Sequence, residues 1–195
     1  MKLFFDLETT GLPKQKSFDE FYPPEELDKY DLSRIIEIGI IVIKNNKIYK
    51  TYTSIVKPND FISLNPKITE ITGITDKDIL NEGKDFKVVL DEIKPLLIEA
   101  SVINSYNINF DVNILLSEIF RVNDIEFLEY MKTKKTECTM QLASKYFNKN
   151  HYIKLEQVYK TLFKEDPKQD HRAFNDAILC KDVYYKLKEI LKNRR

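Results

Sequence analysis

Apolar and polar residues follow a strand-like pattern in the first third of this chain and a helix-like pattern in the rest. Residues 2–8 are mostly apolar, residues 35–43 are an almost continuous β-branched run, and residues 47–57 alternate between apolar and polar side chains. Asn45 and Asn46, which separate the last two segments, are typical of a tight turn. The pattern therefore predicts one strand followed by a β-hairpin.

After these strands, apolar residues recur every three or four positions. The clearest example is residues 86–97, where Pro95 is expected to cause a kink or an internal break. A short strand is expected at residues 102–104. Further helices are expected at residues 109–122, 139–146, 155–163 and 172–191. Early strands followed by helices favour an α/β fold with a mixed sheet.

One long segment, at about residues 12–34, has neither pattern. It contains three of the seven prolines and many charged residues, so we interpret it as a surface loop. Loops of this length are uncommon without a functional role. With 43% hydrophobic and 12% aromatic residues, residues 1–195 can bury a substantial core and are predicted to form a single domain.

Composition and charge exclude several classes of protein. The formal net charge is zero, which argues against a protein that coats long duplex DNA. Residues 132–164 hold eight lysines against two acids, however, and residues 181–195 hold six basic residues against two acids. These segments could guide a phosphate backbone, or they could simply be solvated helix faces. Lys132, Lys134 and Lys135 are the candidate backbone contacts.

The predicted location is cytoplasmic. Two isolated cysteines are too few for a disulfide framework, which favours a reducing compartment. The first residues lack the pattern of a signal peptide, and no apolar stretch approaches the ~20 residues of a membrane span, so no membrane association is expected.

Two carboxylates near the N-terminus are the first candidate functional residues. In a strand at residues 2–8, Asp6 and Glu8 project from the same face near its C-terminal end. Like charges among apolar neighbours are costly to bury unless cations neutralise them. Because hard oxygen ligands suit Mg²⁺ or Mn²⁺, the spacing predicts a metal site.

Three later residues can complete this site. Asp111 lies in the first turn of an expected helix, where it could be an ordinary first-turn acid, but the strand at 102–104 would bring it to the sheet edge where ligands usually bind. His171 and Asp176 lie five residues apart at the entrance to another helix, although a surface histidine and a capping aspartate would give the same pattern. His151 has no acidic neighbour in sequence and is interpreted as structural or exposed.

Together these residues predict a specific chemistry. Four acids can hold two divalent cations ~4 Å apart, which stabilises both the attacking and the leaving oxygen in phosphodiester hydrolysis. A histidine can then act as a base, since an imidazole has an ordinary pKa of about 6.5.

In these motifs the chain resembles the DEDDh exonucleases, the DnaQ-like group of the ribonuclease H-like superfamily, which includes polymerase proofreading subunits, ribonuclease T and the three-prime repair exonucleases. The landmarks occur in family order along nearly the whole chain. They are residues 5–12 (Phe-Asp-Leu-Glu-Thr-Thr-Gly-Leu), 35–39 (Ile-Ile-Glu-Ile-Gly), 71–75 (Ile-Thr-Gly-Ile-Thr), 107–111 (Asn-Ile-Asn-Phe-Asp) and 171–177 (His-Arg-Ala-Phe-Asn-Asp-Ala). The resemblance implies a ribonuclease H-like fold with a mixed five-stranded sheet flanked by helices.

The resemblance also implies a role for each catalytic residue. Asp6, Glu8 and Asp176 would bind a first Mg²⁺ or Mn²⁺ ion, Asp6 and Asp111 would engage a second, and His171 would be the general base.

The resemblance implies a set of substrate contacts as well. Leu12 and Ile71 would wedge against the terminal bases, although either could instead be a core residue. Glu8 and the backbone around Thr9 and Thr10 would meet the 3′-terminal hydroxyl. Three further residues complete the expected substrate-binding set, and they are Thr72, Asn107 and His171.

Two positions depart from expectation. Tyr106 stands before Asn107 where relatives often have histidine, so that histidine's function is missing. The loop at 12–34 is longer than in compact proofreading subunits and is the expected determinant of substrate choice. Glu37, an acid inside an apolar strand, is expected at a strand end or facing solvent rather than behind the site.

The implied function is a 3′→5′ exonuclease with two bound metal ions that releases nucleoside 5′-monophosphates from single-stranded or frayed ends, with DNA as the expected substrate in proofreading or repair. Two alternatives stay open: an RNA-trimming or oligonucleotide-degrading exonuclease, and a non-catalytic module that binds nucleic acid or a polymerase. The expected partners are 3′ ends of single-stranded DNA or RNA, and a polymerase or other replication protein.

Overall fold

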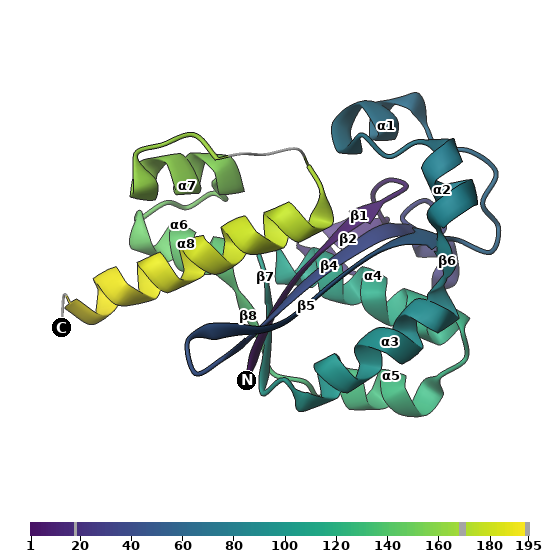
Figure 1. The fold of residues 1–195 in the computed structure, drawn as a ribbon, viewed down its shortest axis with the longest axis horizontal. Helices are drawn as coiled ribbons and strands as arrows, with labels where there is room; N and C mark the ends of the chain where they lie inside the picture. The colour runs from purple at the N-terminus through teal and green to yellow at the C-terminus, as the bar shows by residue number, and fades with distance from the viewer. Residues whose placement is uncertain (18, 168–170, 194–195) are drawn as a thin grey trace.

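A mixed β-sheet forms the centre of the computed structural model of the chain, which describes residues 1–17, 19–167 and 171–193 (Figure 1). The strand order is β6-β5-β4-β1-β7-β8. In the middle, β1 is antiparallel to β4 and parallel to β7. The strands are β1 (Lys2–Thr9), β4 (Ile35–Lys44), β5 (Lys47–Lys57), β6 (Lys84–Asp85), β7 (Val102–Ser105) and β8 (Thr136–Cys138).

The described part of this sheet has six strands, so the prediction of five was wrong in strand number. The extra edge strand β6 has two residues and pairs in parallel with the end of β5. At the other edge, the three residues of β8 pair in parallel with β7. Such short strands have no measurable alternation, and their pairing depends on the neighbouring strand rather than on their own sequence.

Helices cover both faces of the sheet (Figure 1). Alternate residues of β1 divide between the faces: Leu3, Phe5 and Leu7 pack into one apolar cluster, and Phe4 packs into another. The first cluster includes α3 (Phe86–Glu99), α4 (Ile108–Arg121) and α5 (Ile125–Lys132). The second includes α6 (Thr139–Tyr146), α7 (Leu155–Phe163) and α8 (Ala173–Asn193).

Most long helices match the sequence pattern, with three differences. The expected break at Pro95 is absent, because α3 continues through this proline. The pattern missed α5, and it also missed α1 (Pro66–Thr72) and α2 (Asp76–Glu82), which are short helices fixed by their ends. Asn65 caps α1, and a reciprocal pair of hydrogen bonds between Thr75 and Asp78 caps α2.

The expected surface loop is partly structured and fastened to the core. It contains a small hairpin, β2 (Gln15–Ser17) with β3 (Glu20–Phe21), and the 3₁₀ helix η1 (Leu27–Lys29). Tyr30 is fully buried, and Arg121 of α4 pairs with Asp31 at 2.6 Å. At the hairpin, the Tyr152 hydroxyl donates a hydrogen bond of 2.9 Å to Asp19. Tertiary contacts therefore order a segment that has no periodic pattern of its own.

Among the described residues, no helix combines the length and the apolar character needed to cross a membrane.

Candidate functional site

Three of the predicted acids meet at the C-terminal half of β1. One carboxylate oxygen from each of Asp6, Glu8 and Asp176 lies within 4.8 Å of the others. Asp6 and Glu8 share one strand face because they are two residues apart, as the sequence predicted. Asp176 comes from the first turn of α8, a helix that packs on β1 and β4.

A glycine allows this approach. Gly39 lies opposite Asp6 in the antiparallel pairing of β4 with β1. A Cβ atom at this position would lie 2.3 Å from the backbone nitrogen of Phe174, far closer than atoms can pack. The bare glycine backbone lets the start of α8 touch β4 directly, and this contact carries Asp176 to the acids of β1.

Asp111 enters the same site from the first turn of α4. It is 3% exposed and accepts a 2.6 Å hydrogen bond from the Ser105 hydroxyl. Burial raises the pKa of Asp111 to about 7, although the hydrogen bonds from Ser105 and from the backbone of Leu7 act in the opposite direction. A simple first-turn acid would not need this buried setting, so the tertiary structure favours the site interpretation.

The acids raise one another's pKa values. Burial raises the pKa of Asp6 well above its ordinary range, and the charges of Asp111, Asp176 and Glu8 raise it further. Burial raises the pKa of Glu8 to about 8, with the charge of Asp176 as the next cause. Without a cation, this cluster is more stable when it retains protons near neutral pH.

The donor set fits a divalent cation. Carboxylate oxygens are the ligands that Mg²⁺ and Mn²⁺ prefer, and a cation would replace the protons that the cluster otherwise retains. The raised pKa values therefore indicate that protons or a bound cation must balance the negative charge of these carboxylates.

This electrostatic arrangement predicts how stability changes with pH. In the unfolded chain these carboxyl groups ionise near pH 4, whereas in the folded metal-free protein Glu8 ionises at a pKa of about 8 and Asp111 at about 7. For an acid whose folded-state pKa is raised, the stabilisation present at low pH is lost as pH rises through the folded-state value. We expect the melting temperature in EDTA to fall by several degrees between pH 5.5 and pH 8.

Added Mg²⁺ is the matched measurement for that prediction. The rise in melting temperature that Mg²⁺ produces should increase over the same pH interval, because fewer protons compete for the carboxylates. Thermal unfolding in parallel buffers with EDTA or Mg²⁺ measures both quantities. A Mg²⁺-induced rise that is the same at pH 5.5 and at pH 8 would contradict this account of the site.

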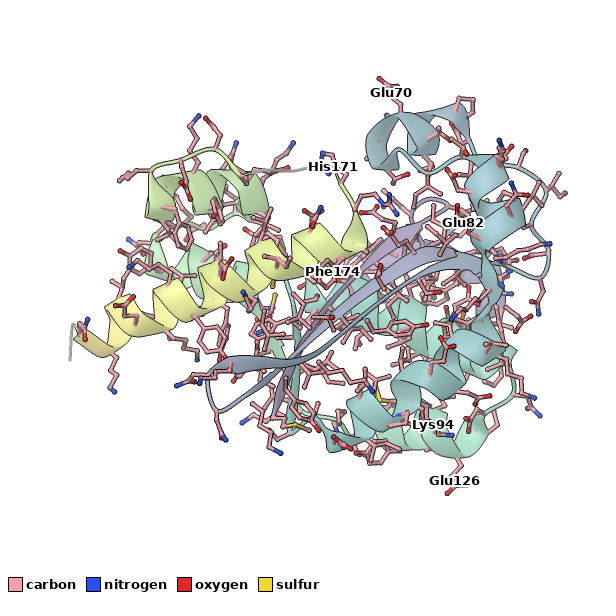
Figure 2. All side chains as sticks on the ribbon, viewed as in Figure 1. Glu70, Glu82, Lys94, Glu126, His171 and Phe174 are labelled. Carbon is pink, nitrogen blue, oxygen red and sulfur yellow. The ribbon has the colours of Figure 1, made fainter. Side chains whose placement is uncertain are left out.

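His171 lies on the segment that leads into α8, two residues before the helix begins. Figure 2 shows it just beyond the start of that helix, with Phe174 in the first turn. Its backbone has a positive φ of 47°, an uncommon conformation for a non-glycine residue. His171 lines a cavity of about 380 Å³ together with Asp6, Asp111 and Asp176. Three carboxylates from three distant parts of the sequence thus line one cavity together with a histidine.

Four of the expected substrate contacts, Leu12, Ile71, Thr72 and Asn107, differ in burial and in whether they line this cavity. Asn107 lines the cavity. Leu12 is 75% exposed and Ile71 is 45% exposed, which excludes the alternative of a core role for either. Thr72 is buried, and its hydroxyl bonds to the backbone of Ile68 and Ile74, so its predicted substrate contact gains no support here.

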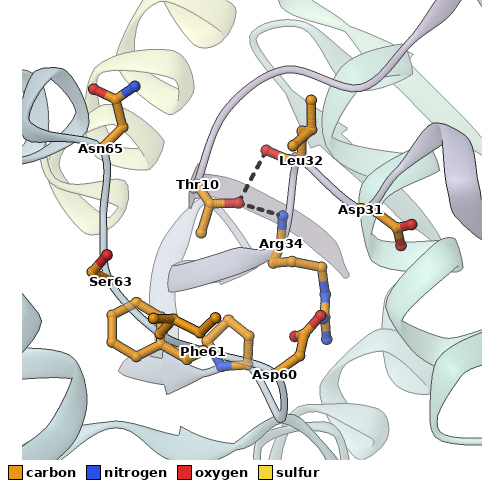
Figure 3. A pocket seen from close by; sticks show the side chains of 10 residues that line it. Thr10, Asp31, Leu32, Arg34, Asp60, Phe61, Ser63 and Asn65 are labelled. Carbon is orange, nitrogen blue, oxygen red and sulfur yellow. Dashed lines mark hydrogen bonds and ion pairs between the residues drawn. The ribbon is translucent and has the colours of Figure 1, made fainter.

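The side chains of Thr9 and Thr10 do not line this cavity, and their hydroxyl groups form hydrogen bonds with nearby backbone groups. The Thr9 hydroxyl donates to the Gly11 carbonyl at 2.7 Å. The Thr10 hydroxyl donates to the Leu32 carbonyl at 3.0 Å and accepts from the Arg34 backbone at 2.9 Å (Figure 3). Thr10 lines a second pocket of about 350 Å³, to which none of the five predicted catalytic residues contributes.

Two candidate lysines are already engaged in local contacts. Lys132 forms ion pairs with Glu25 and Glu129, and Lys134 donates to the Ile98 carbonyl and to the Tyr130 hydroxyl. None of the three lysines 132, 134 and 135 lines the cavity that contains His171.

The structure corrects the interpretation of Glu37. This residue is 2% exposed and lies directly opposite Glu8 in the pairing of β4 with β1, so the expectation that it faces solvent or a strand end was wrong. Both of its carboxylate oxygens accept hydrogen bonds from residues at the start of α8. The only sequence signal was its apolar setting, which is the setting of a buried residue.

Comparison with known proteins places this arrangement among nucleases. A family model described as an exonuclease, RNase_T, matches residues 3–184. The PolC-type DNA polymerase III of Thermotoga petrophila is 30% identical over 187 residues, which are 96% of this chain and 12% of that protein. The 3′-5′ exonuclease DinG of Staphylococcus haemolyticus is 32% identical over 137 residues, which are 70% of this chain and 12% of that protein. The chain thus spans about an eighth of the length of these curated relatives.

Solved structures share the fold. Exonuclease I of E. coli in complex with a dT13 oligonucleotide has a TM-score of 0.73 at 18% identity, covering 99% of this chain and 42% of that one. The nuclease domain of 3′hExo, a DEDDh family member bound to rAMP, has a TM-score of 0.67 at 15% identity, covering 97% of this chain and 92% of that one. These likenesses confirm the predicted ribonuclease H-like α/β fold.

Proposed function

This chain belongs to the exonuclease family that the RNase_T model describes, and we propose that it removes nucleotides from the 3′ end of single-stranded or frayed nucleic acid as nucleoside 5′-monophosphates. One observation carries the proposal: Asp6, Asp111, Asp176 and His171 line a single cavity, and Glu8 lies with Asp6 and Asp176. Four acids beside one histidine are the groups that phosphodiester hydrolysis requires.

We assign the acids to two Mg²⁺ or Mn²⁺ ions. Asp6, Glu8 and Asp176 would hold one ion, because their oxygens already lie within 4.8 Å of one another. Asp6 would also contribute to a second ion with Asp111, whose charge is the largest single influence of another residue on the pKa of Asp6. The ions would stabilise negative charge on the attacking and leaving oxygens.

His171 would remove the proton from the attacking water. The water oxygen forms a new bond to the terminal phosphorus, and the bond from that phosphorus to the 3′ oxygen of the preceding nucleotide breaks. The left-handed backbone of His171 sets its side chain beside the cavity, just ahead of the helix that carries Asp176.

The single-domain organisation of residues 1–195 and the cytoplasmic location stay predictions.

DNA is the favoured substrate, with a role in proofreading or repair. The support is the similarity to PolC-type DNA polymerase III and to DinG, and a PolC-like context would make a polymerase the natural partner. RNA trimming is the second candidate, because a solved structure of the same fold holds rAMP. Exposed Leu12, at the base of the structured loop, would stack on the terminal base of either substrate.

End-labelled oligonucleotides test the proposal directly. With Mg²⁺, a 5′-labelled single strand should be shortened one nucleotide at a time, and a 3′-labelled strand should release labelled mononucleotide in the first step. EDTA should abolish both reactions, because the clustered acids cannot act without cations. Matched DNA and RNA strands in the same assay separate the two candidate substrates.

Each of the other outcomes has a defined meaning. Release of the 5′ label first, or equal cleavage in EDTA, would refute the proposed activity. Binding of oligonucleotides without shortening of DNA or RNA in Mg²⁺ or Mn²⁺ would instead support the non-catalytic module.

A further inference from the structure

Glu37 adds a fifth carboxylate beside the proposed catalytic acids, although no step of the chemistry uses it. It lies on β4 opposite Glu8 and is almost completely buried. A buried charge next to four other acids is strongly unfavourable unless it is paired and fully hydrogen-bonded. A buried glutamate at this position therefore needs a partner that compensates its charge.

The partner is the beginning of α8. Arg172 donates from Nε to both oxygens of Glu37, at 3.0 and 3.1 Å, and from a terminal nitrogen to Oε1. The backbone nitrogen of Ala173, the first residue of the helix, donates to Oε2 at 2.9 Å. Glu37 thus receives a forked guanidinium and also caps the helix from a strand 135 residues away.

The first turn of α8 is built on these same residues. The backbone nitrogens of Asn175 and Asp176 donate to the Arg172 carbonyl at 2.9 and 3.0 Å. His171 directly precedes Arg172 and has a left-handed backbone. Whatever holds Arg172 and Ala173 in place therefore sets the position of both His171 and Asp176.

We propose that Glu37 is a positioning residue, which acts through Arg172 and Ala173 to hold His171 and Asp176 in reach of Asp6 and Glu8. This inference rests on the proposed exonuclease function. The pair also balances charge beside Glu8, since Arg172 lowers the pKa of Glu8 whereas Glu37 raises it. Without Glu37, the positive charge of Arg172 beside Glu8 would lose this negative partner and would disfavour a cation bound at Glu8.

Glu37→Gln tests the proposal because it removes the charge and keeps the size. We expect kcat to fall between about 10-fold and 100-fold with KM changed less than about 3-fold, since a displaced catalytic group slows the reaction of substrate already bound. The Mg²⁺ concentration that gives half-maximal activity should rise. In metal-free protein, the amides of residues 173–176 should exchange with deuterium faster than in the wild type.

Glu118→Gln is the matched control. Glu118 is buried on α4 and also receives a forked guanidinium, from Arg34, but it does not line the cavity that contains His171. Both variants should lower the melting temperature by several degrees, because each removes the charge of a buried carboxylate from an ion pair with arginine. Only Glu37→Gln should change kcat and the exchange at the start of α8.

Arg172→Gln provides a second test, since its side chain is 42% exposed and the substitution is tolerated more readily. It should lower kcat as Glu37→Gln does, and the double variant should be no slower than the slower single variant. An active wild type with unchanged kcat and unchanged exchange in Glu37→Gln would overturn the positioning role. Equal loss of kcat in the Glu118→Gln control would overturn it too. An inactive wild type would instead refute the proposed function, and the exchange measurement would still decide whether Glu37 holds the helix.

Discussion

Asp6→Asn is expected to abolish exonuclease activity and, in metal-free protein, to raise the melting temperature. The loss of activity should be at least ~10³-fold, which corresponds to about 4 kcal/mol of lost transition-state stabilisation. Asp6 is the acid to which both proposed ions would bind, so no neighbouring carboxylate can replace it. An amide of the same shape keeps the packing and removes the charge.

The expected rise in melting temperature comes from removing the same negative charge that metal binding requires. In the absence of metal, burial and the charges of Asp111, Asp176 and Glu8 make the ionised Asp6 carboxylate unfavourable. Asparagine has no charge to bury, so the folded state gains relative to the unfolded chain, and each kcal/mol gained corresponds to about 2–4 °C in a protein of this size. The difference between variant and wild type should grow as pH rises from 5.5 to 8, because the wild type becomes progressively less stable.

Asp91→Asn is the appropriate control, because Asp91 is an exposed acid on α3 outside the cavity. Cleavage of labelled oligonucleotide and thermal unfolding in EDTA should both be unchanged in this variant. Shortening that depends on metal and proceeds at the wild-type rate in Asp6→Asn would rule out the proposed ligand set. A lower melting temperature for Asp6→Asn in EDTA would show that the ionised cluster is stabilised by something other than metal.

His171→Ala should reduce single-turnover cleavage between about 10²-fold and 10⁴-fold, the usual contribution of a positioned base. Mg²⁺ binding should persist, because the substitution leaves in place Asp6, Glu8 and Asp176, whose oxygens lie within 4.8 Å of one another. The Mg²⁺-induced rise in melting temperature, measured on the same preparation, separates loss of the base from loss of the metal site.

The chain contains one other histidine, which supplies the control. His151 is exposed and does not line the cavity, so His151→Ala should cleave at the wild-type rate. If His171→Ala retains full single-turnover activity, another group must act as the base. If it loses the Mg²⁺-induced stabilisation instead, His171 belongs to the metal site.

The sequence predicted the parts of the fold that have a strong period. The helices at residues 139–146 and 155–163 match the structure at both ends, and the hairpin of β4 and β5 lies where the β-branched run and the asparagine turn indicated. The sequence did not predict the short strands β6 and β8, because they contain too few residues to show a period. Their pairing is determined by a neighbouring strand.

The proposed site was likewise predictable where its residues belong to a local sequence pattern. Asp6, Glu8, Asp111, His171 and Asp176 could be proposed from the sequence because each belongs to a short motif of contiguous residues, and the motifs occur in a recognisable order. Glu37 could not be interpreted correctly in this way. Its function depends on an arginine 135 residues away, and an acid in a strand has the same local pattern whether it is solvated or paired.

By itself, the sequence determined which residues we propose for the chemistry and that Asp6 and Glu8 share one strand face, because the period of side chains along a strand depends only on chain neighbours. Only the tertiary structure decided that the start of α8 touches β4 at Gly39, that Asp111 is buried beside Asp6, and that the loop at 12–34 is fastened to the core. The pKa values and ion pairs that result depend on distances through space and on burial, which residues far apart in the chain acquire only when it folds.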